Sequence, residues 1–394
     1  MIDKRLRNLL LICLTSATWS FGFGMGSQLV THWLRARDQS ETEIGLNHAC
    51  HYLGLAVASL AVPWLTRRFG TRTAALGMVI CGVTLALFPW ADGPVGWFGL
   101  RLLNGAASAL SLIPLEAMVS RDARPEERTR DFGFYAVALT LGAAGGIWLG
   151  LDLYRPDSAM AFYLGAAPAL LSGVAVWRCL KAGSAAALEG SAPMPIQWSR
   201  HFLSFGTAWC QGFLEGGMLA FLSSYLTARG LSADLAGGMM GVTMVGVILF
   251  QVPVSWLADR RGRVPVLLGC YAITLAGLAL VPFCPGTPTL ALCLFAFGAC
   301  SGAMYPLGLA LLGEAIPEPS LARGYSLYMA MECAGSLMGA PAMGGARDLW
   351  GEGAMFAVGV GAVGVVLAGW IAMRWKHAST AAHATSENDH QHAA

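Results

Sequence analysis

Long apolar stretches alternate with short polar segments along the whole of this 394-residue chain. Each stretch is close to the roughly 20 residues that an α-helix needs to cross a bilayer core of about 30 Å. Backbone amides in hydrocarbon must be satisfied within their own segment, and the runs lack the alternation of a membrane barrel, so helices are expected. Twelve spans are predicted, at residues 9–33, 43–65, 73–91, 94–119, 131–153, 158–180, 202–227, 233–257, 264–283, 288–313, 322–346 and 352–375.

The pattern of the first half of the chain recurs in the second half. Trp19 and Gly22 recur as Trp209 and Gly212, at an offset of 190 residues. Further matches follow in chain order: Phe23 and Gly26 with Phe213 and Gly216, Trp64-Leu65 with Trp256-Leu257, Pro114-Leu115 with Pro306-Leu307, and Arg130, Tyr135, Gly142 and Gly146 with Arg323, Tyr328, Gly335 and Gly339. Two like-oriented copies around a shared midplane site are one design of secondary transporters.

We therefore predict an all-α integral membrane protein of 12 transmembrane helices in two pseudo-symmetric six-helix bundles. The N-terminal bundle covers residues 1–180 and the C-terminal bundle covers 201–376. A cytoplasmic linker rich in Ala, Gly, Ser and Pro covers 181–200, and a disordered cytoplasmic tail covers 377–394.

Composition supports a membrane protein and argues against other classes. Hydrophobic residues make up 56% of the chain and charged residues 12%, with a mean hydropathy of +0.57, which leaves too little polar surface for a soluble globule. The net charge of +2 comes from dispersed loop residues, so no nucleic-acid partner is expected. The chain shows no nucleophile-base constellation, no metal-ligand spacing and no nucleotide-binding loop, so we expect neither an enzyme nor a cofactor nor a bound metal.

The distribution of positive charge predicts the orientation. If the N-terminus is cytoplasmic, 19 of the 25 Lys and Arg residues fall in cytoplasmic segments and five in outer loops, with Arg101 inside a span. This asymmetry follows the positive-inside rule and places both termini in the cytoplasm. The basic cluster before the first span resembles the start of a signal peptide, but the span is long, so an uncleaved helix in the cytoplasmic membrane is expected.

The loop after the second span of each half carries a recognisable motif. In the second half, residues 255–263 read Ser-Trp-Leu-Ala-Asp-Arg-Arg-Gly-Arg. This resembles the Gly-x-Leu-Ala-Asp-Arg-x-Gly-Arg pattern of the major facilitator superfamily at all but the first position, and the resemblance extends over the whole chain. The first-half equivalent keeps Leu65 and Gly70 but has Arg67 where the acid belongs, which puts the corresponding gate in doubt.

The resemblance implies a cytoplasmic gate. A carboxylate at a helix end can accept hydrogen bonds from the free amides at another helix N-terminus and interact with its dipole. Asp259 is therefore predicted to dock onto the fifth helix of the other half, near Arg130 and Asp131, with Arg260 and Arg263 beside it. The alternative is that this cluster only anchors the topology.

Ionisable residues inside spans are expected to have a function, because a charge at the bilayer centre costs roughly 2.5 to 3.5 kcal/mol. Arg101, with Asn104 and Ser108 on its face, resembles the fourth-helix Arg-x-x-x-Gly motif of the family, which is linked there to proton coupling or substrate handling. A structural arginine that reaches toward the outer interface is the alternative.

Two acidic residues lie in spans of the second half. Glu215 follows Gln211 by one helical turn, and the family architecture implies that this seventh helix lines a central cavity. A carboxyl group there can bind and release a proton as access alternates; cation recognition and a structural role are the alternatives. Glu332, with Tyr328 on its face, is the second candidate for the proton-coupling or substrate cavity.

Polar residues near the outer ends of the first two spans form a third group. Gln28 and His32 lie one turn apart in the first span, and His48 and His51 lie in the second. We assign these four residues to an outer vestibule or a response to pH; a metal site is the alternative, although no carboxylate accompanies them.

The sequence therefore predicts a secondary active transporter that works by alternating access on a small organic solute, with protons as the coupling ion. Export is favoured by a Gly- and Pro-rich run over residues 335–345, which resembles an antiporter pattern of the family. A proton-coupled importer, an uncoupled facilitator and a non-transporting sensor or scaffold remain alternatives. The protein is expected to be a monomer in the lipid bilayer.

Overall fold

The computed structural model describes residues 4–39, 41–179 and 198–392, and within them the regular structure is entirely helical, with no strand. All 12 predicted stretches are helical there. The helices of the first half are α1 (Lys4–Arg35), α2 (Glu41–Ser59), α3 (Val62–Phe69), α4 (Arg72–Leu87), α5 (Gly93–Asp122), α6 (Arg128–Leu153) and α7 (Met160–Cys179). Those of the second half are α8 (Phe202–Ala228), α9 (Ala233–Arg261), α10 (Arg263–Leu280), α11 (Thr287–Ala315), α12 (Leu321–Trp350) and α13 (Ala354–His392).

The predicted second span is bent rather than straight. It divides into α2 and α3, which meet at an angle of 59°. Pro63 occupies the first turn of α3, where its missing N–H breaks the hydrogen-bond ladder but is tolerated as a helix start. Gly70 ends α3 with a φ of 61°, and its repeat counterpart Gly262 ends α9 with a φ of 95°. Both motif loops therefore need glycine for a backbone conformation that other residues rarely adopt.

Nine described helices are long and apolar enough to cross a membrane, and ten are when the α2–α3 pair counts as one span. The two remaining long helices are α8 and α12, with 27 and 30 residues. These two carry the mid-helix residues Glu215 and Glu332, which suits helices that face the protein interior more than lipid. The count of 12 membrane-crossing helices therefore stays a prediction, although the all-helical membrane fold is confirmed.

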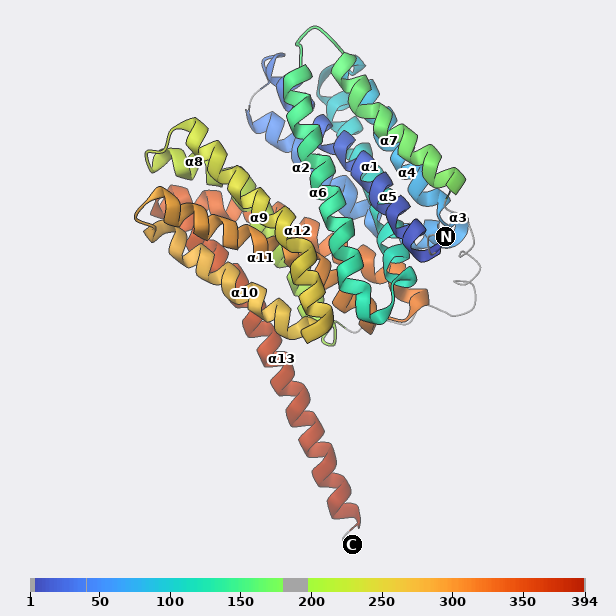
Figure 1. Ribbon diagram of the computed structural model, residues 1–394, viewed down its shortest axis with the longest axis vertical. Coiled ribbons are helices and arrows are strands. Elements are labelled where there is room, and N and C mark those ends of the chain that lie inside the picture. Colours follow the sequence, from blue (N-terminus) through green and yellow to red (C-terminus); the bar gives the residue numbers. More distant parts are fainter. Residues whose placement is uncertain (1–3, 40, 180–197, 393–394) are drawn as a thin grey trace.

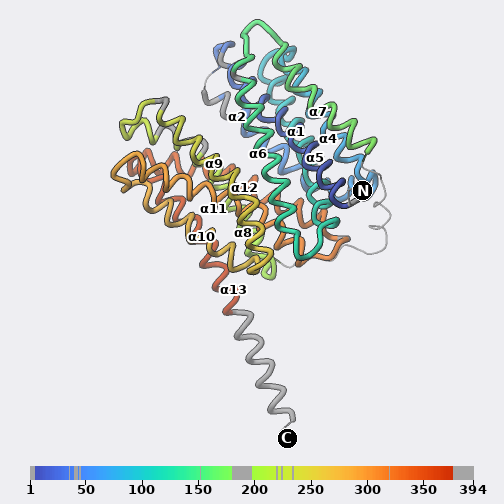
Figure 2. The backbone as a smooth tube through the Cα atoms, viewed as in Figure 1, coloured from blue at the N-terminus to red at the C-terminus, as the bar shows by residue number. Residues whose placement is uncertain are grey.

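The helices form two groups, blue to green and yellow to red, that lie against each other in the lower part of the view and diverge toward its top (Figures 1 and 2). In the first group α1 packs on α6 and α7, and in the second α8 packs on α12 while α9 packs on α11. The groups meet mainly through α2 with α12 and α6 with α9, which are equivalent pairs in the two repeats. Of the linker proposed at 181–200, the part up to residue 197 lies outside the described residues. The helix α13 is described as far as His392, and the disorder proposed for the tail 377–394 stays a prediction.

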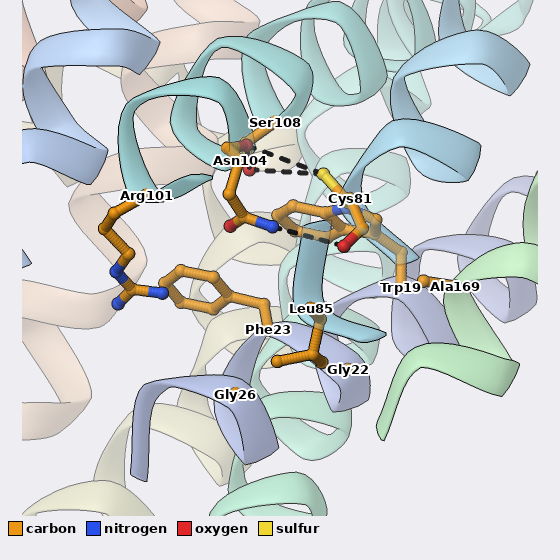
Figure 3. Close-up of a pocket in the computed structure, with 10 residues that line it drawn as sticks. All are labelled: Trp19, Gly22, Phe23, Gly26, Cys81, Leu85, Arg101, Asn104, Ser108 and Ala169. Atoms are coloured by element: carbon orange, nitrogen blue, oxygen red, sulfur yellow. Dashed lines mark hydrogen bonds between the residues drawn. The ribbon is translucent and has the colours of Figure 1, made fainter. Parts of the chain in front are cut away.

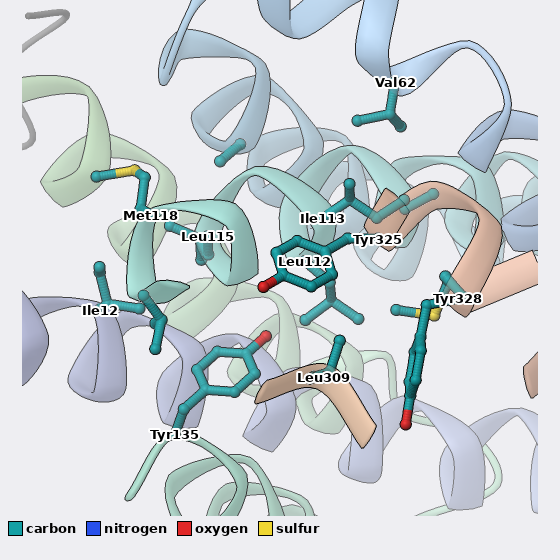
Figure 4. Close-up of a cluster of buried hydrophobic side chains, with 14 of the residues drawn as sticks. Ile12, Val62, Leu112, Ile113, Leu115, Met118, Tyr135, Leu309, Tyr325 and Tyr328 are labelled. Atoms are coloured by element: carbon teal, nitrogen blue, oxygen red, sulfur yellow. The ribbon is translucent and has the colours of Figure 1, made fainter. Parts of the chain in front are cut away.

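One buried core joins the two groups of helices. It contains Ile12 and Tyr135 from the first group and Leu309, Tyr325 and Tyr328 from the second (Figure 4). A second core lies within the C-terminal group, and a third, around Trp33 and Phe162, lies within the N-terminal group. Shared burial between the groups is thus concentrated at the end where α6 begins. We call this the α6 end of the molecule.

Glycines allow the equivalent pairs α1–α6 and α8–α12 to pack backbone against backbone. A Cβ atom at Gly335 or Gly339 would overlap the carbonyl oxygens of Trp209 and Phe213, respectively. In the first repeat, a Cβ at Gly142 would similarly overlap the backbone of α1. Small residues that permit such close approach are a common basis of helix association in membranes.

A Gly339→Ala substitution is therefore expected to destabilise the protein by about 1 to 3 kcal/mol, because α8 and α12 must move apart to accommodate one methyl group. Gly345, on the same helix, has open space around its would-be Cβ and provides a matched control. Thermal unfolding of both variants in detergent would measure the difference. Equal melting temperatures for Gly339→Ala and Gly345→Ala would contradict the packing argument.

Candidate functional site

The α6 end is held closed by a carboxylate of one half bound to a helix N-terminus of the other. Asp259, in the last turn of α9, accepts hydrogen bonds from the backbone amides of Thr129 at 3.1 Å and Arg130 at 2.8 Å. Both amides belong to the first turn of α6, where they have no partner within the helix, and the helix dipole adds to the attraction for an anion. The Asp259 side chain is only 4% exposed, so water screens these bonds little.

Arg263 completes this cross-connection. Its Nη2 lies 3.1 Å from Asp259 Oδ1, and its Nε donates to Thr129 Oγ1 at 2.7 Å. The same guanidinium contacts the carbonyl oxygen of Pro125 and the carboxylate of Glu314. One arginine of the second half thus holds both the carboxylate of its own half and the turn before α6 in the other half. We call Asp259, Arg263, Thr129 and Arg130 the latch.

The other predicted gate residues are arranged differently from the expectation. Arg130 reaches Asp259 through its backbone amide, while its guanidinium pairs with Glu127 at 3.0 Å. Asp131 does not contact Asp259; its carboxylate pairs with Arg5, which ties the start of α1 to α6. The Arg260 guanidinium stacks over Trp256, 3.8 Å from the ring centroid. Arg5 was not predicted as a gate residue, because it lies far from α6 in the sequence and only the fold brings the two together.

At the equivalent position in the other half, no carboxylate stands in the place of Asp259. Arg67 occupies the place of the acid and is exposed. A groove remains there between α3 and the start of α12, with a cavity of about 50 Å³ lined by residues that include Thr66, Gly70, Glu318 and Leu321. The interface of α2 and α3 with α12 therefore lacks the carboxylate on which the latch between α6 and α9 depends.

Glu215 lies near the middle of α8, 13 residues from its start, or about 20 Å along the axis. Its side chain is exposed, and among the described residues it has no hydrogen bond or ion pair. Gln211, one turn earlier, is half-buried, and its Oε1 is a buried atom without a partner. The repeat offset of 190 puts Met25 at the position equivalent to Glu215 in the first half. This carboxyl group therefore belongs to one half only.

Glu332 lies on α12 beside α8 and is half-buried, with its Oε2 buried and unpartnered. Its carboxyl group is within electrostatic range of Glu215. Tyr328, one turn earlier on the same face, donates from its hydroxyl to the carbonyl oxygen of Tyr305 at 3.1 Å. The structure thus brings the two predicted acids of the second half together at mid-depth.

Arg101 is buried in the first half and has no carboxylate partner among the described residues. Its Nη2 donates to His48 Nδ1 at 3.0 Å, and its Nε is buried without a partner. Asn104 donates instead to Thr84 Oγ1 at 2.8 Å. Arg101 and Asn104 line a small pocket with Trp19 and Phe23 (Figure 3), whose cavity volume of about 20 Å³ has room for a water-sized group.

The four residues predicted for an outer vestibule fall into two separate places. His48 and His51 lie with Arg101: His48 accepts at Nδ1 from the guanidinium, so its neutral ring donates from Nε2 to Thr31, 2.7 Å away. His51 is buried against the ring of Phe23. His32 packs on Tyr154 instead, and Gln28 is half-buried on α1. In the described part of the chain no group of three potential ligands is placed to hold a metal ion.

The prediction missed one buried acid, Glu116 of α5. It is fully buried and accepts a hydrogen bond from the hydroxyl of Tyr305 in the other half and, at 3.5 Å, from that of Tyr135. The residue lies inside the predicted span 94–119, directly after the repeated Pro114-Leu115 pair, and that position within a span was the available signal.

Comparisons with known proteins agree with this architecture. The profile of the Major Facilitator Superfamily matches residues 9–225 and 202–392, each match covering about one repeat. The chain belongs to this superfamily. The uncharacterised MFS-type transporter YfkF of Bacillus subtilis is 24% identical over 358 residues, which cover 87% of this chain and 88% of that protein. The uncharacterised MFS-type transporter YE1530 of Yersinia enterocolitica is 24% identical over 344 residues, covering 84% and 86%.

Solved structures of the superfamily share the fold. The Escherichia coli fucose:proton symporter FucP superposes with a TM-score of 0.74 at 16% identity, covering 95% of this chain and 99% of that chain. The human organic anion transporter MFSD10 gives a TM-score of 0.74 at 16% identity, covering 93% and 100%. This MFS protein is therefore a multi-pass membrane transporter, and the prediction that it is not an enzyme is confirmed by its family.

Proposed function

We propose that this MFS transporter moves a small organic solute by proton-coupled alternating access, with Glu215 as the group that exchanges a proton with water. The observation that supports this most is the exposed, unpaired carboxyl of Glu215 at half the length of α8. A carboxyl group at such depth needs a neutral form, a cation or water. Exchange among these three states, as the two halves change access, couples the proton to the solute.

The latch indicates which conformation is described. It closes the α6 end, so Glu215 is reached from the opposite end. The exposed arginines at the α6 end include Arg67, Arg124 and Arg261, which suits a cytoplasmic face. We therefore propose that the chain is in its outward-facing conformation, as a monomer in the cytoplasmic membrane with both termini inside.

Proton-coupled export is the direction that we propose, as the Gly- and Pro-rich run at 335–345 suggests. FucP is a fucose:proton symporter and XylE a proton:xylose symporter, and both share only the fold with this chain, at 16% and 14% identity. Import by symport is therefore the alternative to be tested beside export. Shared fold carries no argument about the solute.

The test uses the full-length protein in sealed proteoliposomes that contain a pH-sensitive dye. A panel of small organic solutes is added with and without an imposed pH gradient. An antiporter will acidify the compartment that the solute leaves. A symporter will acidify the compartment that the solute enters. Solute counterflow with no pH response would identify a facilitator and overturn the proposed coupling.

A further inference from the structure

Glu116 is a titratable group deep in the molecule to which the proposed mechanism assigns no role. It lies on α5, six residues before the end of that helix, and is 0% exposed. Its Oε1 accepts from the hydroxyls of Tyr305 on α11 and Tyr135 on α6. Its Oε2 is buried and has no hydrogen-bond partner. Among the described residues no arginine, lysine or histidine forms an ion pair with it.

The groups that face this carboxyl group are neutral phenols and one further acid. No described side chain of α1, α2, α3 or α4 makes a hydrogen bond or ion pair with it. The titratable groups that contact it or lie within its electrostatic range are Tyr135 on α6, Tyr305 on α11, and Tyr325, Tyr328 and Glu332 on α12. A negative charge on Glu116 would therefore meet no cation and would repel Glu332.

These surroundings favour the neutral acid. An ionised carboxylate removed from water without a cation is so unfavourable that such a group normally takes up a proton instead. With the proton on Oε2, the other oxygen still accepts from both phenols, and only one hydroxyl lacks a partner. With the proton lost, a charged oxygen would be buried with no donor. The carboxyl group of Glu116 thus carries a proton in the latched conformation.

The hydrogen bond to Tyr305 crosses between the two halves of the chain. Tyr305 is 189 residues away in the sequence, on a helix of the C-terminal group. When the halves separate at the α6 end, this phenol leaves and water reaches the carboxyl group, so ionisation becomes favourable. We propose that Glu116 is a proton site distinct from Glu215, which binds a proton when the α6 end closes and releases it when that end opens.

This proposal rests on the alternating access proposed above, but it needs neither a solute nor proton exchange at Glu215. Because the closed state binds the proton more tightly, lowering the pH favours closure. One linked proton changes the ratio of closed to open molecules by up to about tenfold per pH unit, between the proton affinities of the two states.

The first test is infrared difference spectroscopy of the protein in lipid nanodiscs at pH 7, wild type against Glu116→Gln. We expect the wild type to show the C=O band of a protonated carboxylic acid that the variant lacks. If Glu116→Gln instead lacks a band of an ionised carboxylate that the wild type shows, the proposal is overturned. If Glu116→Gln does not fold, Tyr305→Phe serves in its place: it removes one donor and is expected to shift the same C=O band, and an unchanged spectrum would contradict the assignment.

The second test measures closure against pH. Fluorophores are introduced at the exposed positions Arg124 and Arg261 as non-canonical amino acids, because the exposed native Cys179 would react with thiol dyes. In the wild type, energy transfer is expected to rise as the pH falls, without any solute or gradient. Glu116→Gln is expected to stay closed at every pH, and the exposed control Glu126→Gln to behave as wild type.

The outcomes separate this proposal from the proposed function. If Glu116→Gln keeps the pH dependence of the wild type, Glu116 is not the linked site. If Glu215→Gln stops proton-driven transport but leaves the pH dependence of closure intact, the two sites are distinct, as proposed. If no solute moves protons at all, coupled transport fails while the pH dependence of closure still decides the role of Glu116.

Discussion

A Glu215→Gln variant is expected to lose proton-driven transport while it still folds and binds lipid. Glutamine has nearly the same shape and keeps a hydrogen-bonding end, but it cannot release a proton. One proton moved through 100 mV supplies about 2.3 kcal/mol, enough for a solute gradient of up to about fifty-fold. The variant should therefore equilibrate the solute to a ratio of about one. Solute flux into proteoliposomes, with and without a pH gradient, measures this ratio.

The matched control is Asp92→Asn, which neutralises an exposed carboxylate outside the membrane helices. It is expected to retain the wild-type gradient. Should Glu215→Gln concentrate the solute as well as the control does, Glu215 does not carry the coupled proton. Glu332, within electrostatic range of Glu215, would then be the next residue to neutralise.

An Asp259→Asn variant is expected to shift the protein toward opening at the α6 end. The carboxylate accepts from two backbone amides and from Arg263, and hydrogen bonds to a charged group contribute about 1.5 to 3 kcal/mol each. Asparagine loses the charge and one acceptor oxygen. We expect a net shift of about 1 to 3 kcal/mol, or roughly 5- to 150-fold in the ratio of open to closed molecules. Energy transfer between the labelled positions reports this ratio.

Transport should change with it. If closing of the open α6 end limits the transport cycle, the weakened latch slows turnover. The energy transfer between the fluorophores and the solute flux should then change together. Glu126→Gln, which changes an exposed charge at the same end, should alter neither. Unchanged populations and unchanged rates in Asp259→Asn would show that this motif only anchors the topology.

Local patterns predicted much of the architecture. The apolar runs located the long helices, because a membrane segment must satisfy its own backbone and a run of about 20 residues has few alternatives. The repeat offset anticipated that Gly335 and Gly339 pack as Gly142 and Gly146 do. The break at Pro63 was missed. A proline within an apolar run signals the first turn of a new helix, and Pro63 holds that position in α3.

Contacts between residues far apart in the sequence could not be predicted in the same way. Tyr305 meets Glu116 across 189 residues, and Arg5 meets Asp131 across 126, so no local spacing records either contact. Asp259 was predicted to dock onto the N-terminal end of α6. In the structure, the backbone amides of Thr129 and Arg130 donate the hydrogen bonds to its carboxylate. The grouping of His48 with Arg101 depends on how α2 packs against α5. Side-chain partners of this kind follow from topology, which the helix pattern leaves open.

The duplicated halves have lost their chemical equivalence. Glu215 has Met25 as its counterpart, and Arg101, at an offset of 192, has Cys293. A homodimer assembled from two N-terminal halves would therefore carry Arg101 twice and lack Glu215, and one assembled from two C-terminal halves would carry Glu215 twice and lack Arg101. We expect co-expressed half-chains to restore transport only as an unlike pair, because the two halves keep the same backbone arrangement but have diverged in their side chains.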